Sequence, residues 1–143
     1  ILLTFTLIFF KYKDIQGAIA HVNLDQRDEA LELVAPHLDV LCSDIKSMRD
    51  QFYQEICRPA TVEQVLHSIR TAHELGVHVE TRTNIIPGKN DDPDEHYAIA
   101  SWVRENLGAD SPWHITRFFP AYKLMEIPPT PDETLFAAAE QGR

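Results

Sequence analysis

The clearest pattern along the chain is an alternation of apolar or small residues with polar ones at positions 77–85. Successive side chains of a β-strand point to opposite faces. One face would carry Val77, Val79, Thr81, Thr83 and Ile85, and the other would carry His78, Glu80, Arg82 and Asn84. A strand between two helices in a parallel sheet is usually apolar on both faces. Burying these charges unpaired would cost several kcal/mol each, so we expect the polar face to line a wet cavity or bind a ligand.

A helix with clear end signals is predicted before this strand. Thr61 and Gln64 have the spacing of a capping box, in which each residue bonds the other's backbone N–H. Gly76 suits the left-handed position that follows a last helical turn. Apolar residues recur between them at helical spacing, at Val62, Val65, Leu66, Ile69, Ala72 and Leu75.

A second helix is predicted after the strand. Asp92 and Glu95 again have capping-box spacing, and Gly108 ends the pattern. The expected apolar side comprises Tyr97, Ile99, Ala100, Val103 and Leu107. Thr130 is expected to cap a last helix. The remaining predictions are strands at 3–10, 39–44 and 113–118, a helix from Asp25 to about Val34, and a helical turn at 47–57.

Helices and strands therefore alternate along the chain with short connections. This order predicts an α/β fold of parallel strands joined by right-handed crossovers. The 143 residues are enough for one domain with a core. Part of a (β/α) barrel or a small open sheet fits this order, and in both folds functional groups gather at the carboxyl ends of the strands.

Charge and cysteine content exclude several classes of protein. A net charge of -9 argues against a general nucleic-acid binder, because such binding depends on clustered Lys and Arg. The two cysteines, Cys42 and Cys57, lack the C-x2-C spacing of a zinc knuckle or redox dithiol. The apolar residues 1–10 are too few to span a bilayer and lack the order of a signal peptide. We therefore expect a cytoplasmic protein that binds neither nucleic acid nor membrane.

The alternation recurs in the two other predicted strands. One face of the first carries Val40, Cys42, Asp44 and Lys46, and one face of the other carries His114, Thr116 and Phe118. Parallel pairing would bring carboxylates, cations, an amide and an imidazole together from Asp44, Lys46, Glu80, Arg82, Asn84, His114 and Thr116. Such a set suits a small zwitterion with hydroxyl groups.

Simpler interpretations of the same residues remain open. Asp44 and Lys46 could form a solvated pair at a strand end, and Glu80 and Arg82 could form a structural ion pair inside a barrel. A different barrel enzyme, using Lys46 or His114 for acid–base chemistry, is a further alternative. Ordinary surface or core positions are expected for the helical histidines His67, His73 and His96.

Several motifs, in a consistent order, resemble a known family. The segment DIK at 44–46 is similar to the Asp-x-Lys strand motif of radical S-adenosylmethionine enzymes of the glycyl-radical-activase type. The segments GVHVE at 76–80 and IIPGKND at 85–91 are similar to the strand and loop that follow in that group. The segment WHITRFFPAYKL at 113–124, with PPTP at 128–131 and ETL at 133–135, resembles the radical enzyme of the AmmeMemoRadiSam system. That enzyme is related to pyruvate formate-lyase activating enzyme.

The resemblance implies the C-terminal half of a partial (β/α)6 barrel that binds S-adenosylmethionine and a [4Fe-4S] cluster. In that family an electron from the cluster cleaves S-adenosylmethionine to methionine and a 5′-deoxyadenosyl radical, which abstracts hydrogen from a substrate. By position, His114 would lie beside the adenosyl group, and Asp44 and Lys46 near the cofactor and an associated cation site. The full cofactor-binding set implied in this way is Asp44, Lys46, Glu80, Arg82, Asn84, His114 and Thr116.

The chain also departs from the family pattern. The family binds its cluster through a C-x3-C-x2-C loop, and Cys42 and Cys57 cannot replace the three thiolates required. We interpret residues 1–20 as a divergent start and residues 21–143 as the C-terminal half of a radical-SAM-like barrel. The expected function is that of a catalytically incomplete part of a radical enzyme, whose partner is a protein substrate or the N-terminal half. The alternative is a non-catalytic interaction or oligomerisation domain derived from that family, with residues 1–10 supplying a sheet edge.

Overall fold

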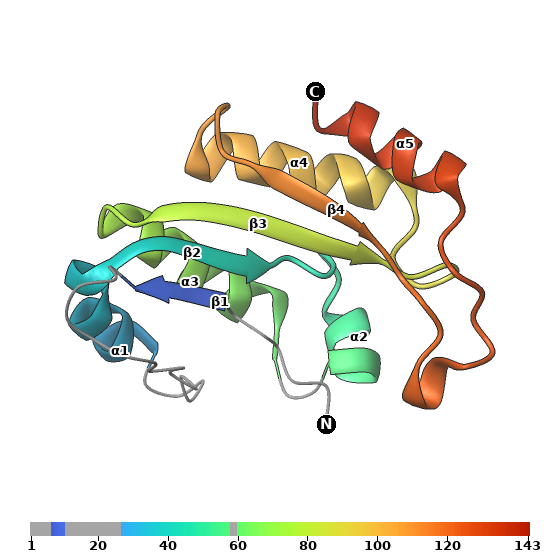
Figure 1. Cartoon of the computed structure of the whole chain (residues 1–143), viewed down its shortest axis with the longest axis horizontal. Helices are drawn as coiled ribbons and strands as arrows, with labels where there is room; N and C mark the ends of the chain where they lie inside the picture. Colours follow the sequence, from blue (N-terminus) through green and yellow to red (C-terminus); the bar gives the residue numbers. More distant parts are fainter. Residues whose placement is uncertain (1–6, 11–26, 58–59) are drawn as a thin grey trace.

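The computed structural model describes residues 7–10, 27–57 and 60–143. Figure 1 shows its main elements, which are β1 (Leu7–Phe10), α1 (Arg27–Val34), β2 (Leu38–Asp44), α3 (Val62–Glu74), β3 (His78–Ile85), α4 (Pro93–Leu107), β4 (Trp113–Arg117) and α5 (Asp132–Gln141). Short helical segments lie between them at η1 (Ala35–His37), α2 (Asp50–Phe52), η2 (Tyr53–Cys57) and η3 (Tyr122–Leu124). No helix in these ranges is long and apolar enough to cross a membrane.

The strands form one four-stranded sheet in the order β1-β2-β3-β4. Strands β2, β3 and β4 are parallel, which confirms the predicted α/β fold and its partial-barrel character. Strand β1 is different, because it pairs antiparallel with β2, whereas parallel strands were expected throughout. A period-two pattern identifies the faces of a strand but not its direction, so the sequence pattern carried no signal for this reversal.

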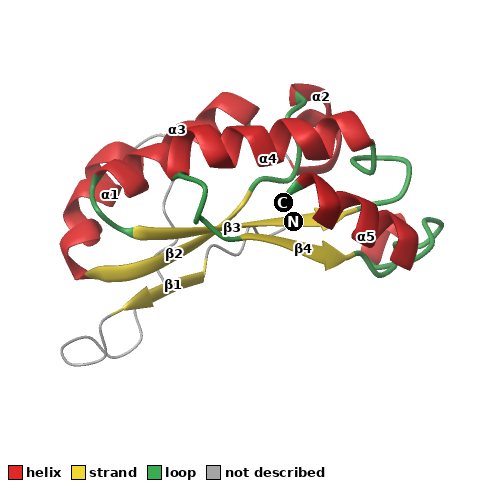
Figure 2. Ribbon diagram, turned by 90° about the horizontal axis from the view of Figure 1, so that it is seen from above, coloured by secondary structure: helices red, strands yellow, loops and turns green. Residues whose placement is uncertain are grey.

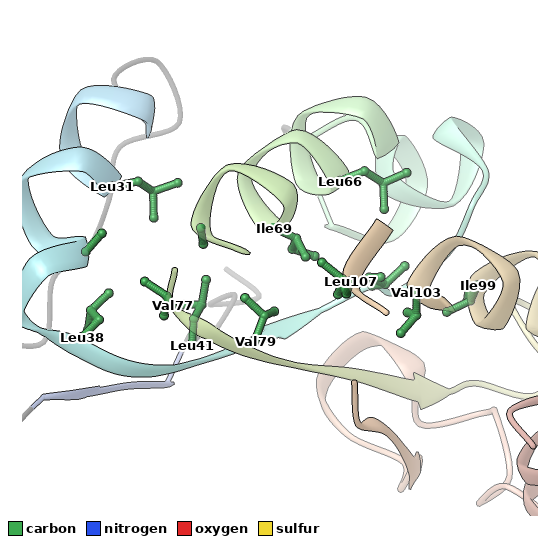
Figure 3. Close-up of a cluster of buried hydrophobic side chains, with 13 residues drawn as sticks. Leu31, Leu38, Leu41, Leu66, Ile69, Val77, Val79, Ile99, Val103 and Leu107 are labelled. Carbon is green, nitrogen blue, oxygen red and sulfur yellow. The ribbon is translucent and has the colours of Figure 1, made fainter. Parts of the chain in front are cut away.

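The helices α1, α3 and α4 lie on one side of the sheet (Figure 2). Between these helices and the strands is a core of aliphatic side chains, drawn in Figure 3, which includes Leu41, Ile69, Val79, Ile99 and Val103. Because Val79 packs into this core, the residues of opposite parity on β3 point to the other face of the sheet. The helices leave that face uncovered (Figure 2).

The predicted helix ends are largely confirmed. Both bonds of the capping box between Thr61 and Gln64 are present, and Gly76 has the left-handed φ of +83°. Asp92 caps α4 by accepting a hydrogen bond from the backbone N–H of Asp94, and α4 ends before Gly108. The prediction was wrong for two residues of the expected apolar sides, because Leu75 and Tyr97 are exposed. The predicted cap Asp25 and residues 3–6 of the first predicted strand lie outside the described ranges.

Thr130 does not cap α5, as was expected; the residue at the cap position is Pro131. The Thr130 side chain is fully buried, where its hydroxyl donates to the carbonyl of Ile85 at 2.6 Å and accepts from the backbone N–H of Phe118 at 2.8 Å. This single side chain therefore ties the ends of β3 and β4 to the segment before α5. Cap preference is local, whereas these partners are distant in sequence, so the tertiary contact prevails.

Candidate functional site

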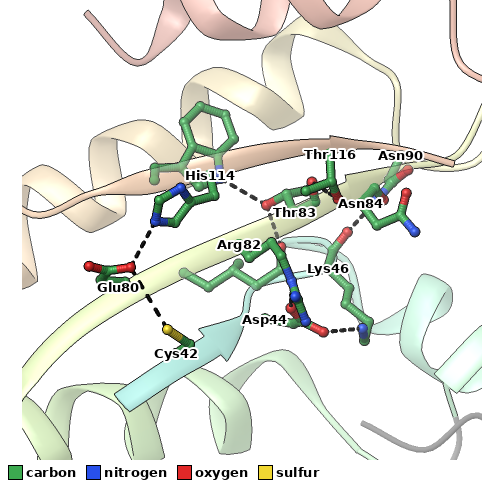
Figure 4. A network of polar contacts seen from close by, with 12 residues as sticks. Cys42, Asp44, Lys46, Glu80, Arg82, Thr83, Asn84, Asn90, His114 and Thr116 are labelled. Carbon is green, nitrogen blue, oxygen red and sulfur yellow. Dashed lines mark hydrogen bonds and ion pairs between the residues drawn. The ribbon is translucent and has the colours of Figure 1, made fainter. Parts of the chain in front are cut away.

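The parallel register aligns polar residues across three strands on the face that the helices leave uncovered. Asp44 is opposite Arg82, and Arg82 is opposite His114. The neighbouring row pairs Asn84 with Thr116. Exposure along β3 alternates as predicted: Val79, Thr81, Thr83 and Ile85 are buried, whereas His78, Glu80, Arg82 and Asn84 are partly or fully exposed. Figure 4 shows that the predicted site residues gather in one region.

Asp44 pairs with both cations of this face. One of its carboxylate oxygens, Oδ1, accepts from Arg82 Nε at 2.7 Å, and Oδ2 accepts from Lys46 Nζ at 2.6 Å. The hydrogen bond to Asp44 raises the pKa of Arg82 above its ordinary value. Because the Asp44 side chain is only 8% exposed, the pair with Lys46 is not the solvated pair of the simpler interpretation. Arg82 pairs with Asp44 and not with Glu80. The alternative of a structural ion pair between Glu80 and Arg82 is therefore wrong as well.

Glu80 is the centre of a second group on the same face. Its Oε2 contacts His114 Nε2 at 2.9 Å and Cys42 Sγ at 3.8 Å, and its Oε1 is 3.6 Å from His78 Nε2. The hydrogen bond from His114 lowers the pKa of Glu80. Burial, and next the charge of Glu80, raise the pKa of the Cys42 thiol. The thiol form of Cys42 is therefore favoured here over the thiolate.

Asn90 was not among the predicted site residues, yet it builds the carboxyl end of the sheet. It is fully buried, and its Oδ1 accepts from the backbone N–H of Ile86 at 2.6 Å. Its Nδ2 donates to the carbonyl of Lys46 at 2.6 Å and to that of Asn84 at 3.0 Å. His96, buried as a core residue, contacts the Asn90 carbonyl through Nε2 at 2.9 Å. Asn90 belongs to the IIPGKND segment noted in the sequence, which was the available signal for its importance.

Glu95 holds the loop that follows β2 and so places Lys46. Its buried carboxylate accepts from the Ser47 hydroxyl, from the backbone N–H of Met48 at 2.8 Å, and pairs with Arg49 Nη2 at 2.5 Å. The spacing of Glu95 from Asp92 predicted a capping box. The Glu95 side chain does not form one, because it bonds to the loop after β2 instead. The sequence held no signal for this contact, since its partners are more than forty residues away.

The backbone of Lys46 also contacts a small apolar cluster that contains Tyr53. The backbone N–H of Lys46 donates to the Tyr53 hydroxyl at 3.1 Å, and burial raises the pKa of Tyr53 to about 12. Tyr53 packs with Phe52, Ile86 and Phe118. Phe118 was placed on the polar face by its spacing, but β4 ends at Arg117 and Phe118 turns into this cluster. The site is therefore supported by apolar packing at the carboxyl ends of the strands.

The comparisons with known proteins identify the family of this chain and support its fold. A model of the radical SAM superfamily matches residues 2–100, and the chain belongs to this superfamily. The match includes most of residues 1–20, and the division of the chain at residue 20 stays a prediction.

A relative and a solved structure extend this result. An uncharacterized protein of Methanocaldococcus jannaschii is 44% identical over 103 residues, which are 72% of this chain and 30% of that protein. The chain thus spans less than a third of the length of this curated relative. A crystal structure of a domain of pyruvate-formate lyase-activating enzyme from Bacteroides vulgatus is similar, with a TM-score of 0.62 and 22% identity. The similarity covers 80% of this chain and 67% of that one, and it shows the fold.

The two cofactors that this superfamily implies fit the chain unequally. The polar face offers carboxylates, cations and an imidazole within one region, as a zwitterion with hydroxyl groups requires (Figure 4). The [4Fe-4S] cluster does not fit, because the sequence holds only two cysteines. Within the described ranges, no group of three His, Cys, Asp or Glu residues could hold a metal ion.

Proposed function

We propose that this chain forms the C-terminal part of the barrel of a glycyl-radical-activase-like radical SAM enzyme and binds S-adenosylmethionine on its open face. The observation that carries the proposal is the row Asp44, Arg82 and His114, aligned in register across three parallel strands. A carboxylate, a guanidinium and an imidazole thus lie side by side on the face without helices. In this family the cofactor supplies the radical chemistry, and the residues of the polar face bind and orient it.

Arg82 is the residue best placed to take the carboxylate of the ligand. A guanidinium carries five N–H donors, and Asp44 engages the one on Nε at 2.7 Å. Among the described residues, no other hydrogen-bond partner of the Arg82 side chain occurs, and this side chain is 37% exposed. Asp44 would therefore orient the guanidinium, while the Nη groups would bind the ligand carboxylate.

The ligands of the cluster would have to come from beyond residues 1–143. We propose that the three thiolates belong to another segment of a longer protein or to a partner chain, so that this chain is catalytically incomplete alone. A protein substrate is the other partner that we propose. The same proposal places the enzyme in the reducing cytoplasm, where free cysteines such as Cys42 and Cys57 persist.

Calorimetric titration of the full chain with S-adenosylmethionine, and with the stable analogue S-adenosylhomocysteine, tests the proposal. Arg82→Gln removes a charge-assisted contact and should weaken binding roughly 10- to 100-fold. Arg104→Gln is the matched control, because Arg104 is exposed on α4, away from the polar face. No heat of binding at millimolar ligand, or equal loss in both variants, would contradict the proposal.

A non-catalytic interaction domain is the second candidate, and the edge strand β4 favours it. Within the described ranges, β4 pairs only with β3, which leaves one side of the sheet open to another chain. Residues 7–10 were expected to offer an edge, and β1 is the outer strand at the other end of the sheet, where its one strand partner within the described ranges is β2. Light scattering coupled to size exclusion tests this candidate: a concentration-independent monomer would argue against it.

A further inference from the structure

Glu80 occupies a position that the cofactor-binding proposal does not explain. All three parallel strands present a side chain to its carboxylate: Cys42 from β2, His78 from β3 itself and His114 from β4. Figure 4 labels Cys42 and His114 on either side of Glu80. The contacts are unequal. His114 Nε2 lies at hydrogen-bond distance, 2.9 Å, whereas His78 Nε2 is 3.6 Å away, too far for a hydrogen bond. Glu80 therefore hydrogen-bonds to the imidazole of His114 and not to that of His78.

This contact determines the hydrogen-bonding character of the His114 ring. A neutral imidazole has one N–H and one acceptor nitrogen, and a carboxylate on one nitrogen holds the N–H there. With its Nε2–H donating to Glu80, His114 presents Nδ1 as an acceptor. Among the described residues, the His114 ring makes no other hydrogen bond, and its side chain is about half exposed, at 53%. The Nδ1 acceptor is thus left for a ligand.

We infer that Glu80 is a positioning residue: it fixes the orientation and tautomer of His114, so that Nδ1 accepts a hydrogen bond from a ligand hydroxyl or amino group. The ligand part of this inference rests on the proposed function, since a nucleoside carries such donors on its ribose and base. The carboxylate–imidazole part concerns this chain alone. Carboxylates hold histidines in this way wherever a ring must keep one tautomer.

The carboxylate–imidazole part is tested in the ligand-free full chain by NMR. In the wild type, the His114 Nε2–H proton should be visible and protected from exchange with water. Glu80→Ala should abolish that protection, whereas Glu80→Gln should retain part of it, because the amide oxygen still accepts. The reciprocal test follows the carboxyl carbon of Glu80 during an acid titration. Its midpoint should move to higher pH in His114→Ala and move less in His78→Ala, the matched control.

Two NMR results would overturn the inference. One is a Glu80 midpoint that is the same in His114→Ala as in the wild type. The other is an Nε2–H proton of His114 that stays protected in Glu80→Ala. Neither measurement requires a ligand, so both outcomes are independent of the proposed function.

A double-mutant cycle tests whether Glu80 acts through His114, with S-adenosylhomocysteine as the probe. Glu80→Ala should weaken binding about 10-fold and Glu80→Gln about 3-fold or less. The double variant Glu80→Ala/His114→Ala should bind within about 2-fold of His114→Ala, because the two residues act as a unit. Additive losses would show that Glu80 contacts the ligand directly and would refute the positioning role. If the wild type binds no probe, the proposed function is refuted. The NMR results then still test whether Glu80 fixes the His114 ring, because they need no ligand.

Discussion

Replacing Asn90 by Ala removes the side chain that joins the carboxyl ends of β2 and β3. Three hydrogen bonds are lost: one from the backbone N–H of Ile86, and two to the carbonyls of Lys46 and Asn84. The Asn90 side chain and its bond from the Ile86 N–H are fully buried, and its bonds to the two carbonyls are partly buried, so these partners cannot all turn to bulk water. The substitution therefore affects both the stability of the domain and the placement of Lys46 and Asn84.

The expected loss of stability follows from the number of groups left without a partner. Each buried backbone group that loses its partner costs about 1–3 kcal/mol. Water entering the vacated volume satisfies part of this loss, so we expect a net loss of about 3–5 kcal/mol. Typical domains have a total stability of about 5–15 kcal/mol, and Asn90→Ala should therefore leave the domain marginal or unfolded at 37 °C.

Urea unfolding, followed by circular dichroism, measures this loss as a shift of the midpoint at constant slope. Asn106→Ala is the matched control, because Asn106 makes a single side-chain hydrogen bond, to the Trp102 carbonyl at 2.8 Å within α4. Alanine also has the better helix propensity, so the control should change stability by less than about 1 kcal/mol. A loss below about 1 kcal/mol in Asn90→Ala would refute the role of Asn90 as the tie between the strands.

Three further predictions concern Thr130, Glu80 and the cysteine content of the chain. Thr130→Val should cost about 2–3 kcal/mol in urea unfolding, because the Ile85 carbonyl and the Phe118 N–H lose their buried partner; an unchanged midpoint would contradict this. Since the pKa of Glu80 is lowered in the folded state, its contribution to stability is complete above the ordinary value of about 4.3 and is lost as pH falls below it. The urea midpoint of Glu80→Gln should accordingly fall less steeply than that of the wild type below pH 4.3, and parallel curves would count against this coupling. Anaerobic reconstitution with iron and sulfide should leave the chain without a stoichiometric [4Fe-4S] centre, measured by iron content and visible absorbance; a full cluster would overturn the account of its cysteines.

The elements next to the site were largely predictable because their signals are local. The alternation of β3 repeats every two residues, and the structure buries Val79, Thr81, Thr83 and Ile85 as this period requires. Thr61 with Gln64 and the left-handed Gly76 depend on neighbours within a few residues. Where such a local signal competed with a distant partner, as at Glu95 and Thr130, the prediction failed.

The pairing of charges across the site was decided by strand register. The sequence placed Asp44, Glu80, Arg82 and His114 on one face, and it left open which of them meet. The register places Asp44 opposite Arg82, and these two residues hydrogen-bond to each other. His114 hydrogen-bonds to Glu80. A shift of two residues would preserve every face and change every partner, which is why periodicity alone cannot assign these pairs.

The sequence by itself therefore determined the order of helices and strands, the polar face of β3 and the ends of α3, because backbone geometry and capping act over a few residues. Only the tertiary structure decided the direction of β1, the partners of Glu80 and Arg82, and the burial of Asn90 as a tie between two strands. These features depend on contacts between residues far apart in the chain. Their free energies are set by distance, burial and hydrogen-bond geometry, which exist only once the strands have paired.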